Sequence, residues 1–151
     1  MNTKEESFRF ITGKSVVAIA SLVTIICFFL PWLSSYAMGV VYMGTDSGIH
    51  FAITNSHASG LPGWPYSATL ITAVICLIVS GMYIKRNYPT KLIPVTQIVL
   101  AVLGLLPFIL LKVEVGYWNG VAVVTHFGLW ASILGLVGAI IGSLLEIFHS
   151  Q

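Results

Sequence analysis

FFLPWLSSYAMGVVYMGTDSG, residues 28–48, passes from apolar residues that suit a membrane helix into a polar stretch that lipid would not accommodate. The apolar run that leads into it, residues 16–33, carries no charged residue and approaches the roughly 20 residues that span a hydrocarbon core. Such a run fits either a signal peptide or the first span of a membrane protein. Because Glu5 and Glu6 stand among the cations that precede it, we expect an uncleaved first span.

The composition predicts that the bilayer is the main solvent of the chain. Of the 151 residues, 57% are hydrophobic and 8% are charged, whereas soluble domains have roughly 45–50% and about 25%. A soluble protein with so little charge could not cover its surface with polar groups. The net charge is +2 and there is no basic run, so a nucleic-acid partner has no electrostatic support.

Three further apolar stretches resemble the first one. They cover residues 66–84, 92–111 and 127–145, and none of them contains a charged residue. We therefore predict an all-α membrane protein, a bundle of four transmembrane helices within a single integral domain, residues 1–151. The predicted outer loops are 34–65 and 112–126, and residues 85–91 form a short link on the other side.

The distribution of cations predicts the orientation of these spans. Of the seven Lys and Arg residues, all but Lys112 lie before the first span or in the link 85–91. We therefore expect both termini and the link in the cytoplasm. Compact loops without paired outer cysteines favour a bacterial cytoplasmic membrane. Residues 4–11 are expected either as a short interfacial helix or as a frayed tail.

The first outer loop carries the pattern of a β-hairpin. Residues 36–43 are rich in β-forming side chains, residues 44–48 supply turn residues, and residues 49–53 alternate. We predict an antiparallel pair of strands here, with its turn at 44–48.

The second outer loop repeats the strand pattern. Apolar and polar residues alternate over 112–117, and Asn119-Gly120 is a strong turn signal. A strand here would pair with the hairpin in a small extracytoplasmic antiparallel sheet of three strands, since an isolated hairpin is marginal in water. The alternative is that residues 121–125 begin the fourth span as helix and that residues 112–118 extend the third span.

This layout resembles the claudin-type four-helix fold, in which two outer loops build a small sheet above the bundle. Claudins carry a Gly-Leu-Trp motif and two cysteines in the first outer loop. Here Gly128-Leu129-Trp130 lies in the fourth span, and the outer loops have no cysteine. The resemblance therefore implies a shape for this chain and no functional residues.

Small residues form a stripe on the fourth span, and they predict close helix packing. The stripe consists of Gly135, Gly138, Ala139 and Gly142. We expect it to pack inside the bundle, where Ala101 and Gly104 of the third span can receive it. Self-association through the stripe is the alternative.

The spans offer little chemistry. None holds an ionisable group, which argues against an ion-coupled transporter or pump, and Gln97 is expected to bond a neighbouring helix. Cys27 and Cys76 lie in apolar runs, so we expect reduced, packed thiols. The outer residues of metal-ligand type match no ligand motif; they are Asp46, His50, His57, Glu114 and His126. We expect no metal, no cofactor and no enzymatic activity.

The expected function is therefore non-enzymatic: an accessory or interaction subunit of a larger membrane assembly, which contacts another membrane protein through its helices and outer sheet. Aromatic side chains in the outer loops are the candidate anchors of that contact. They are Tyr42, Trp64, Tyr117 and Trp118. The alternative is a homo-oligomeric pore or membrane effector, in which copies of the chain pack through the glycine stripe of the fourth span.

Overall fold

The computed structural model describes residues 12–37, 41–54, 64–86, 91–110, 117–118 and 121–149. The short helix considered for residues 4–11 lies outside these residues.

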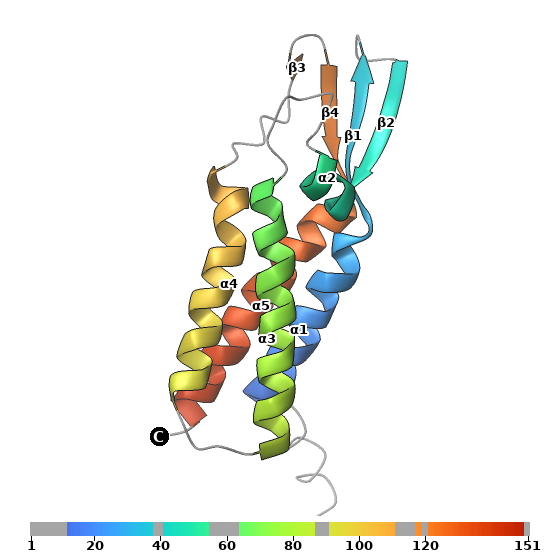
Figure 1. The fold of residues 1–151 in the computed structure, drawn as a ribbon. Coiled ribbons are helices and arrows are strands. Elements are labelled where there is room, and N and C mark those ends of the chain that lie inside the picture. Colours follow the sequence, from blue (N-terminus) through green and yellow to red (C-terminus); the bar gives the residue numbers. More distant parts are fainter. Residues whose placement is uncertain are drawn as a thin grey trace, which may run out of the picture.

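Four long helices form a bundle, with a small sheet at one end (Figure 1). The helices are α1 (Gly13–Phe28), α3 (Ser67–Arg86), α4 (Leu92–Leu110) and α5 (Phe127–His149). Helices α1 and α4 each pack against both α3 and α5, so they occupy opposite corners of the bundle. The start of α1 and the end of α5 lie at the end of the bundle opposite to the sheet.

Three of these helices, α3, α4 and α5, are long and apolar enough to span a membrane, by length and composition. Each begins within one residue of the start of its predicted span, 66–84, 92–111 or 127–145. By the length and composition of its helices, the chain is therefore a multi-pass membrane protein, as predicted. Helix α4 continues through Pro107 to Leu110. Helix α1 is also apolar, but it has only 16 residues.

The prediction that helix continues to residue 33 is wrong. Helix α1 ends at Phe28, and strand β1 (Pro31–Ala37) begins three residues later. Pro31 explains this early end, because proline has no backbone N–H and disfavours helical dihedrals in the residue before it. At its other end, α1 begins after Thr12, whose side-chain oxygen accepts a hydrogen bond from the backbone N–H of Ser15.

The predicted hairpin exists, but its strands lie elsewhere. Strand β1 pairs antiparallel with β2 (Val41–Ser47), so residues 44–47, predicted as turn, are strand. Residues 49–53, predicted as strand, belong to the helix α2 (Gly48–Thr54). Ser47 caps the start of this helix, because its Oγ accepts a hydrogen bond from the backbone N–H of His50 at 3.3 Å. The alternating pattern of residues 49–53 gave no sign of this cap.

The second outer loop adds to the sheet, as predicted, but it supplies two strands where one was expected. Strand β4 (Val121–Thr125) pairs antiparallel with β1, and β3 (Tyr117–Trp118) pairs with β4, so the sheet has four strands in the order β2-β1-β4-β3. The alternative that residues 121–125 are helical is wrong, because α5 begins at Phe127. The strand predicted over 112–117 lies outside the described residues except for Tyr117.

Candidate functional site

The sheet is fastened to the bundle by the Trp32 cluster, which we define as the buried residues Phe28, Trp32, Leu33, Tyr66 and Leu129. The Trp32 indole is fully buried, and its Nε1–H donates to the carbonyl of Cys27 at 3.0 Å. The rings of Phe28 and Tyr66 meet Trp32 edge-on, with centroids 4.8 and 5.7 Å away.

Two glycines make room for this tryptophan. A Cβ added to Gly48 would lie 2.5 Å from Trp32 Cε2, and one added to Gly128 would lie 2.6 Å from the carbonyl oxygen of Pro31. Helices α2 and α5 therefore approach β1 as closely as their backbones allow. Together with the hydrogen bond from the backbone N–H of His126 to Trp32 O, 2.8 Å long, these contacts give the sheet a fixed position on the bundle.

A chain of hydrogen bonds ties three parts of the outer structure together. The Tyr42 hydroxyl lies 2.5 Å from Thr45 Oγ1, Thr45 Oγ1 lies 2.8 Å from Ser34 Oγ, and Ser34 Oγ lies 2.6 Å from His126 Nε2. These residues come from β2, β1 and the junction of β4 with α5. Ser34 is 2% exposed, so its hydroxyl is buried between Thr45 and His126.

The outer residues of metal-ligand type do not come together in the part of the chain that the structure describes, where no group of three or more such side chains is close enough to hold an ion. His126 contacts Ser34, and His50 Nδ1 lies 2.6 Å from Asp46 Oδ1. His57 and Glu114 lie outside the described residues.

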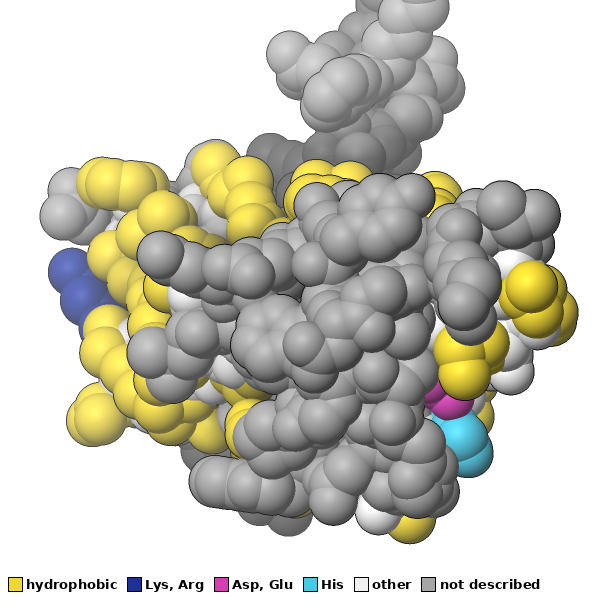
Figure 2. All heavy atoms as spheres, turned by 90° about the horizontal axis from the view of Figure 1, so that it is seen from above, with side chains coloured by type: hydrophobic (Ala, Val, Ile, Leu, Met, Phe, Trp, Pro, Cys, Tyr) yellow, Lys and Arg dark blue, Asp and Glu magenta, His cyan; other side chains and the backbone are white. Residues whose placement is uncertain are grey.

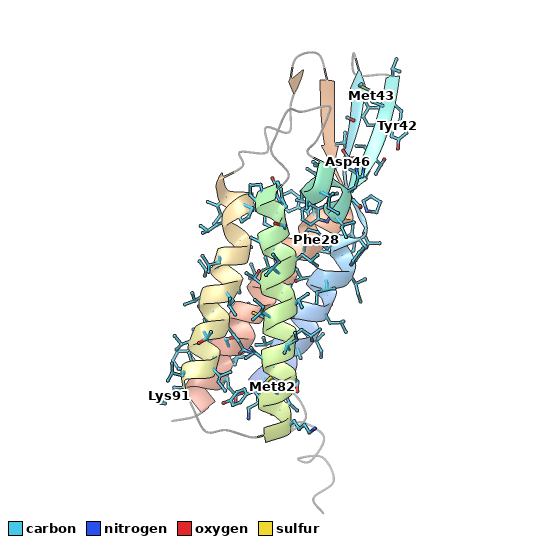
Figure 3. The ribbon with its side chains drawn as sticks, viewed as in Figure 1. Phe28, Tyr42, Met43, Asp46, Met82 and Lys91 are labelled. Atoms are coloured by element: carbon cyan, nitrogen blue, oxygen red, sulfur yellow. The ribbon has the colours of Figure 1, made fainter. Side chains whose placement is uncertain are left out.

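The four candidate anchors lie at separate places around the outer structure. Tyr42 is 58% exposed and lies near the far end of β2 (Figure 3). Tyr117 and Trp118 form β3, at the opposite edge of the sheet, and Trp64 opens the short helix η2 (Trp64–Tyr66) that leads into α3. The structure does not describe the side chains of Trp64, Tyr117 and Trp118.

Two exposed residues next to Tyr42 were missed by the sequence reasoning. Val41 and Met43 are 60% and 56% exposed. We name Val41, Tyr42 and Met43 the hairpin tip. Their apolar character predicted a strand and nothing more, and only the pairing of β1 with β2 shows that they stand at the end of β2 away from the bundle.

The small residues of α5 face α1 within the same chain. A Cβ on Gly135 would collide with the Thr24 hydroxyl, one on Gly138 would lie 3.2 Å from Ala20 Cβ, and one on Gly142 would lie 2.9 Å from the carbonyl oxygen of Gly13. Ala139 joins Ala101 of α4 in a second buried cluster, with Val17, Ala20 and Leu136. Gly104 of α4 faces Thr72 and Leu136 instead.

Helices α3 and α4 are joined by polar contacts at three levels. The side chain of Gln97 donates to Ser80 Oγ at 2.8 Å, so the expected bond to a neighbouring helix is confirmed. Thr69 Oγ1 donates to the carbonyl of Gly104 at 2.8 Å, and the Cys76 thiol lies 3.9 Å from the carbonyl of Gln97. Cys27 and Cys76 are both free and buried, as expected.

An ion pair missed by the sequence reasoning lies at the opposite end of the bundle. Lys14 Nζ is 3.7 Å from Glu146 Oε1 and stands 4.0 Å from the centre of the Tyr83 ring. Three helices, α1, α3 and α5, thus meet around one cation. The pair was missed because Lys14 and Glu146 are separated by nearly the whole sequence.

Comparison with known proteins adds no identification: no protein-family model, no curated protein and no solved structure matches this chain.

Proposed function

We propose that this chain is a non-enzymatic accessory subunit, which binds another integral membrane protein through its outer sheet and its helices. The observation that carries the proposal is the rigid mounting of the sheet. The Trp32 cluster and the hydrogen-bond chain hold the four strands in one position, and this sheet presents exposed apolar side chains such as Tyr42 and Val124. Rigid aromatic anchors on a fixed support are typical of binding surfaces.

The proposal includes four spans, with α1 as the first, in a claudin-like layout. Sixteen helical residues measure about 24 Å, somewhat less than the roughly 30 Å of a hydrocarbon core. The chain can complete the crossing because its next backbone groups are satisfied: the N–H groups of Phe29 and Leu30 donate to Ile26 and Cys27. The outward side chains of α1 are also suited to lipid, with Ile19 63% exposed.

We further propose that the end of the bundle that carries Lys85 and Lys91 faces the cytoplasm of a bacterial cell. Both side chains are exposed there, which the positive-inside rule favours. Lys14 lies at the same end, paired with Glu146.

The alternative, a homo-oligomeric pore, is supported by no specific observation. Gly135, Gly138 and Gly142, which would join neighbouring copies, lie against α1 of their own chain. We therefore prefer the accessory subunit.

Native mass spectrometry tests the proposed function. The full-length protein is extracted gently from its own membrane, and every chain that accompanies it is identified. We expect one distinct membrane protein at fixed stoichiometry, and its recovery should fall in Trp64→Ala and Trp118→Ala while the abundance of this chain stays unchanged. A closed ring of this chain alone, or unchanged recovery in both variants, would contradict the proposal.

A further inference from the structure

The exposed apolar side of α1 is shorter than that of α4. On α1 it begins at the half-buried Val16 and ends at Leu30, fourteen residues later, which is about 21 Å along a helix. On α4 the exposed apolar side chains extend from Leu92 to Ile109, seventeen residues later, or about 26 Å. Figure 1 also shows α1 inclined to α3 and α4, so its length along those two helices is smaller still. The two sides of the bundle therefore differ in apolar length by about one helical turn.

Polar groups limit the apolar side of α1 at the end that carries the sheet. A Cβ added to Gly48 would lie 2.7 Å from the carbonyl oxygen of Phe28, so α2 begins against the last residue of α1. Two residues further on, His50 pairs with Asp46 at 2.6 Å, and the His50 side chain is 54% exposed. Seen from above, an acidic side chain and a histidine stand side by side at the rim of the molecule (Figure 2). A carboxylate is costly in hydrocarbon, so the hydrocarbon beside α1 ends below this pair.

Polar groups also limit α1 at its other end. The helix begins after Thr12, whose side chain is exposed and caps the first turn. Lys14 Nζ lies 3.7 Å from Glu146 Oε1 and 4.0 Å from the centre of the Tyr83 ring. A lysine near the end of a span usually extends its ammonium group toward the headgroups, but this one is held beside the first turn. The hydrocarbon therefore ends near the first turn of α1.

Helix α5 does not lengthen this side of the bundle, although it has 23 residues. A Cβ added to Gly128 would lie 3.0 Å from Leu30 Cβ, and one added to Gly142 would lie 2.9 Å from the carbonyl oxygen of Gly13. The two glycines are fourteen residues apart, so the stretch of α5 beside α1 is also about 21 Å long.

The outward side of α1 is suited to lipid and not to another helix. Close helix packing uses small residues and polar groups. On α1 such residues are buried within the bundle; they include Gly13, Ala20, Ser21 and Thr24. The exposed positions between the two limits carry branched aliphatic side chains, which are Ile19, Leu22, Val23 and Ile26. Acyl chains are therefore the occupant that this side favours.

From these observations we infer that the α1 side of the bundle binds phospholipids with shorter acyl chains than those beside α4, so that the bilayer is locally thinned along α1. A bilayer can match a short span by thinning, at a cost of fractions of a kcal/mol per Å, and shorter chains remove that cost. The inference rests on the proposed function, in which α1 is the first span, and it names the lipid that this span selects.

The test measures the lipid preference on each side of the bundle separately. The full-length protein, with Trp64, Trp118 and Trp130 replaced by phenylalanine, receives one tryptophan reporter and is reconstituted in phosphatidylcholine. Leu22→Trp reports on α1, and Val99→Trp on α4 is the matched control, since these two side chains are 46% and 53% exposed. Trp32 is retained, because it is fully buried and contributes the same background to both proteins. Brominated dimyristoleoyl-, dipalmitoleoyl-, dioleoyl- and dieicosenoyl-phosphatidylcholine then compete with unbrominated dioleoyl lipid, and the quenching gives a relative binding constant for each.

We expect dimyristoleoyl lipid to bind about threefold more strongly than dioleoyl lipid at Leu22→Trp, whereas Val99→Trp should prefer dioleoyl lipid. Ile26→Trp, on the same side of α1 and 54% exposed in the native protein, should repeat the first result if Leu22→Trp does not fold. The same order of preference on α1 and α4 would overturn the inference. Absence of quenching on α1 beside full quenching at Val99→Trp would also overturn it, because lipid would then not contact α1. Neither outcome affects the accessory function, since recovery of a partner by native mass spectrometry does not depend on the chain length of the reconstituted lipid.

Discussion

At the scale of single residues, Trp32 is the largest fully buried side chain among the described residues. It lies where a helix becomes a strand, and it contacts the end of α1, η2 and α4 through the rings of Phe28, Tyr66 and Phe108. In a bilayer the hydrophobic effect does not drive helices together, so stability depends on close packing and on satisfied polar groups. Trp32 provides both, through its ring contacts and its hydrogen bond to Cys27.

We predict that Trp32→Leu lowers the free energy of unfolding by about 3 kcal/mol, because it leaves a cavity and removes an indole hydrogen bond. Trp130→Leu is the control, since the Trp130 side chain is 54% exposed on α5. It should change stability by less than about 1 kcal/mol. Unfolding in mixed micelles, followed by circular dichroism, measures both. Equal losses in the two variants would show that Trp32 is not the point at which the sheet is fastened.

At the scale of elements, the contact between α1 and α5 is the most extensive one between described helices. Gly135 lies against Thr24 and the carbonyl oxygen of Ala20, and Gly142 lies against Gly13. Thr24 Oγ1 donates to the carbonyl of Ala20 at 3.0 Å and reaches the carbonyl of Ser132 at 3.5 Å. Small residues thus let the two backbones approach, while the Thr24 hydroxyl between them is hydrogen-bonded.

We predict that Gly135→Ala destabilises the protein by about 1–3 kcal/mol, because the added methyl group collides with backbone atoms of α1 that cannot move independently. Gly81→Ala on α3 is the matched control. A Cβ at Gly81 meets nothing within 4 Å, so alanine there should stabilise the helix by about 0.5–1 kcal/mol. Unfolding midpoints of the purified variants distinguish the two. A Gly135→Ala protein that keeps its stability but loses an oligomer would indicate that the glycine stripe joins separate chains.

At the scale of the whole molecule, the sheet and the ion pair of Lys14 with Glu146 lie at opposite ends of the bundle. If α1 spans the membrane with the other three helices, then position 12 and position 91 face one side of the membrane and position 53 faces the other. All three of these side chains are exposed.

We predict this arrangement for single cysteines placed in a variant whose two native cysteines are replaced by alanine. A membrane-impermeant maleimide should label Ile53→Cys in intact cells, whereas Thr12→Cys and Lys91→Cys should react only after permeabilisation. Reaction of Thr12→Cys and Ile53→Cys from the same side would mean that α1 does not cross. Labelling of Lys91→Cys in intact cells would reverse the proposed orientation.

The sequence by itself determined the class of the protein and three of its long helices. Composition and uninterrupted apolar runs are properties of the residues alone, because transfer into lipid depends on side chains and not on their neighbours in space. The existence of a sheet in the outer loops was also predictable, from β-forming residues and the turn signal at Asn119-Gly120.

Only the tertiary structure decided how that outer part is built. Residues 49–53 alternate like a strand, yet they form a helix, because Ser47 caps it and Gly48 fits against the Trp32 ring. The pairing of β1 with both β2 and β4 likewise depends on contacts between distant parts of the chain. The hairpin tip could be recognised only from the pairing of β1 with β2, since exposure is a property of the folded molecule and not of a residue type.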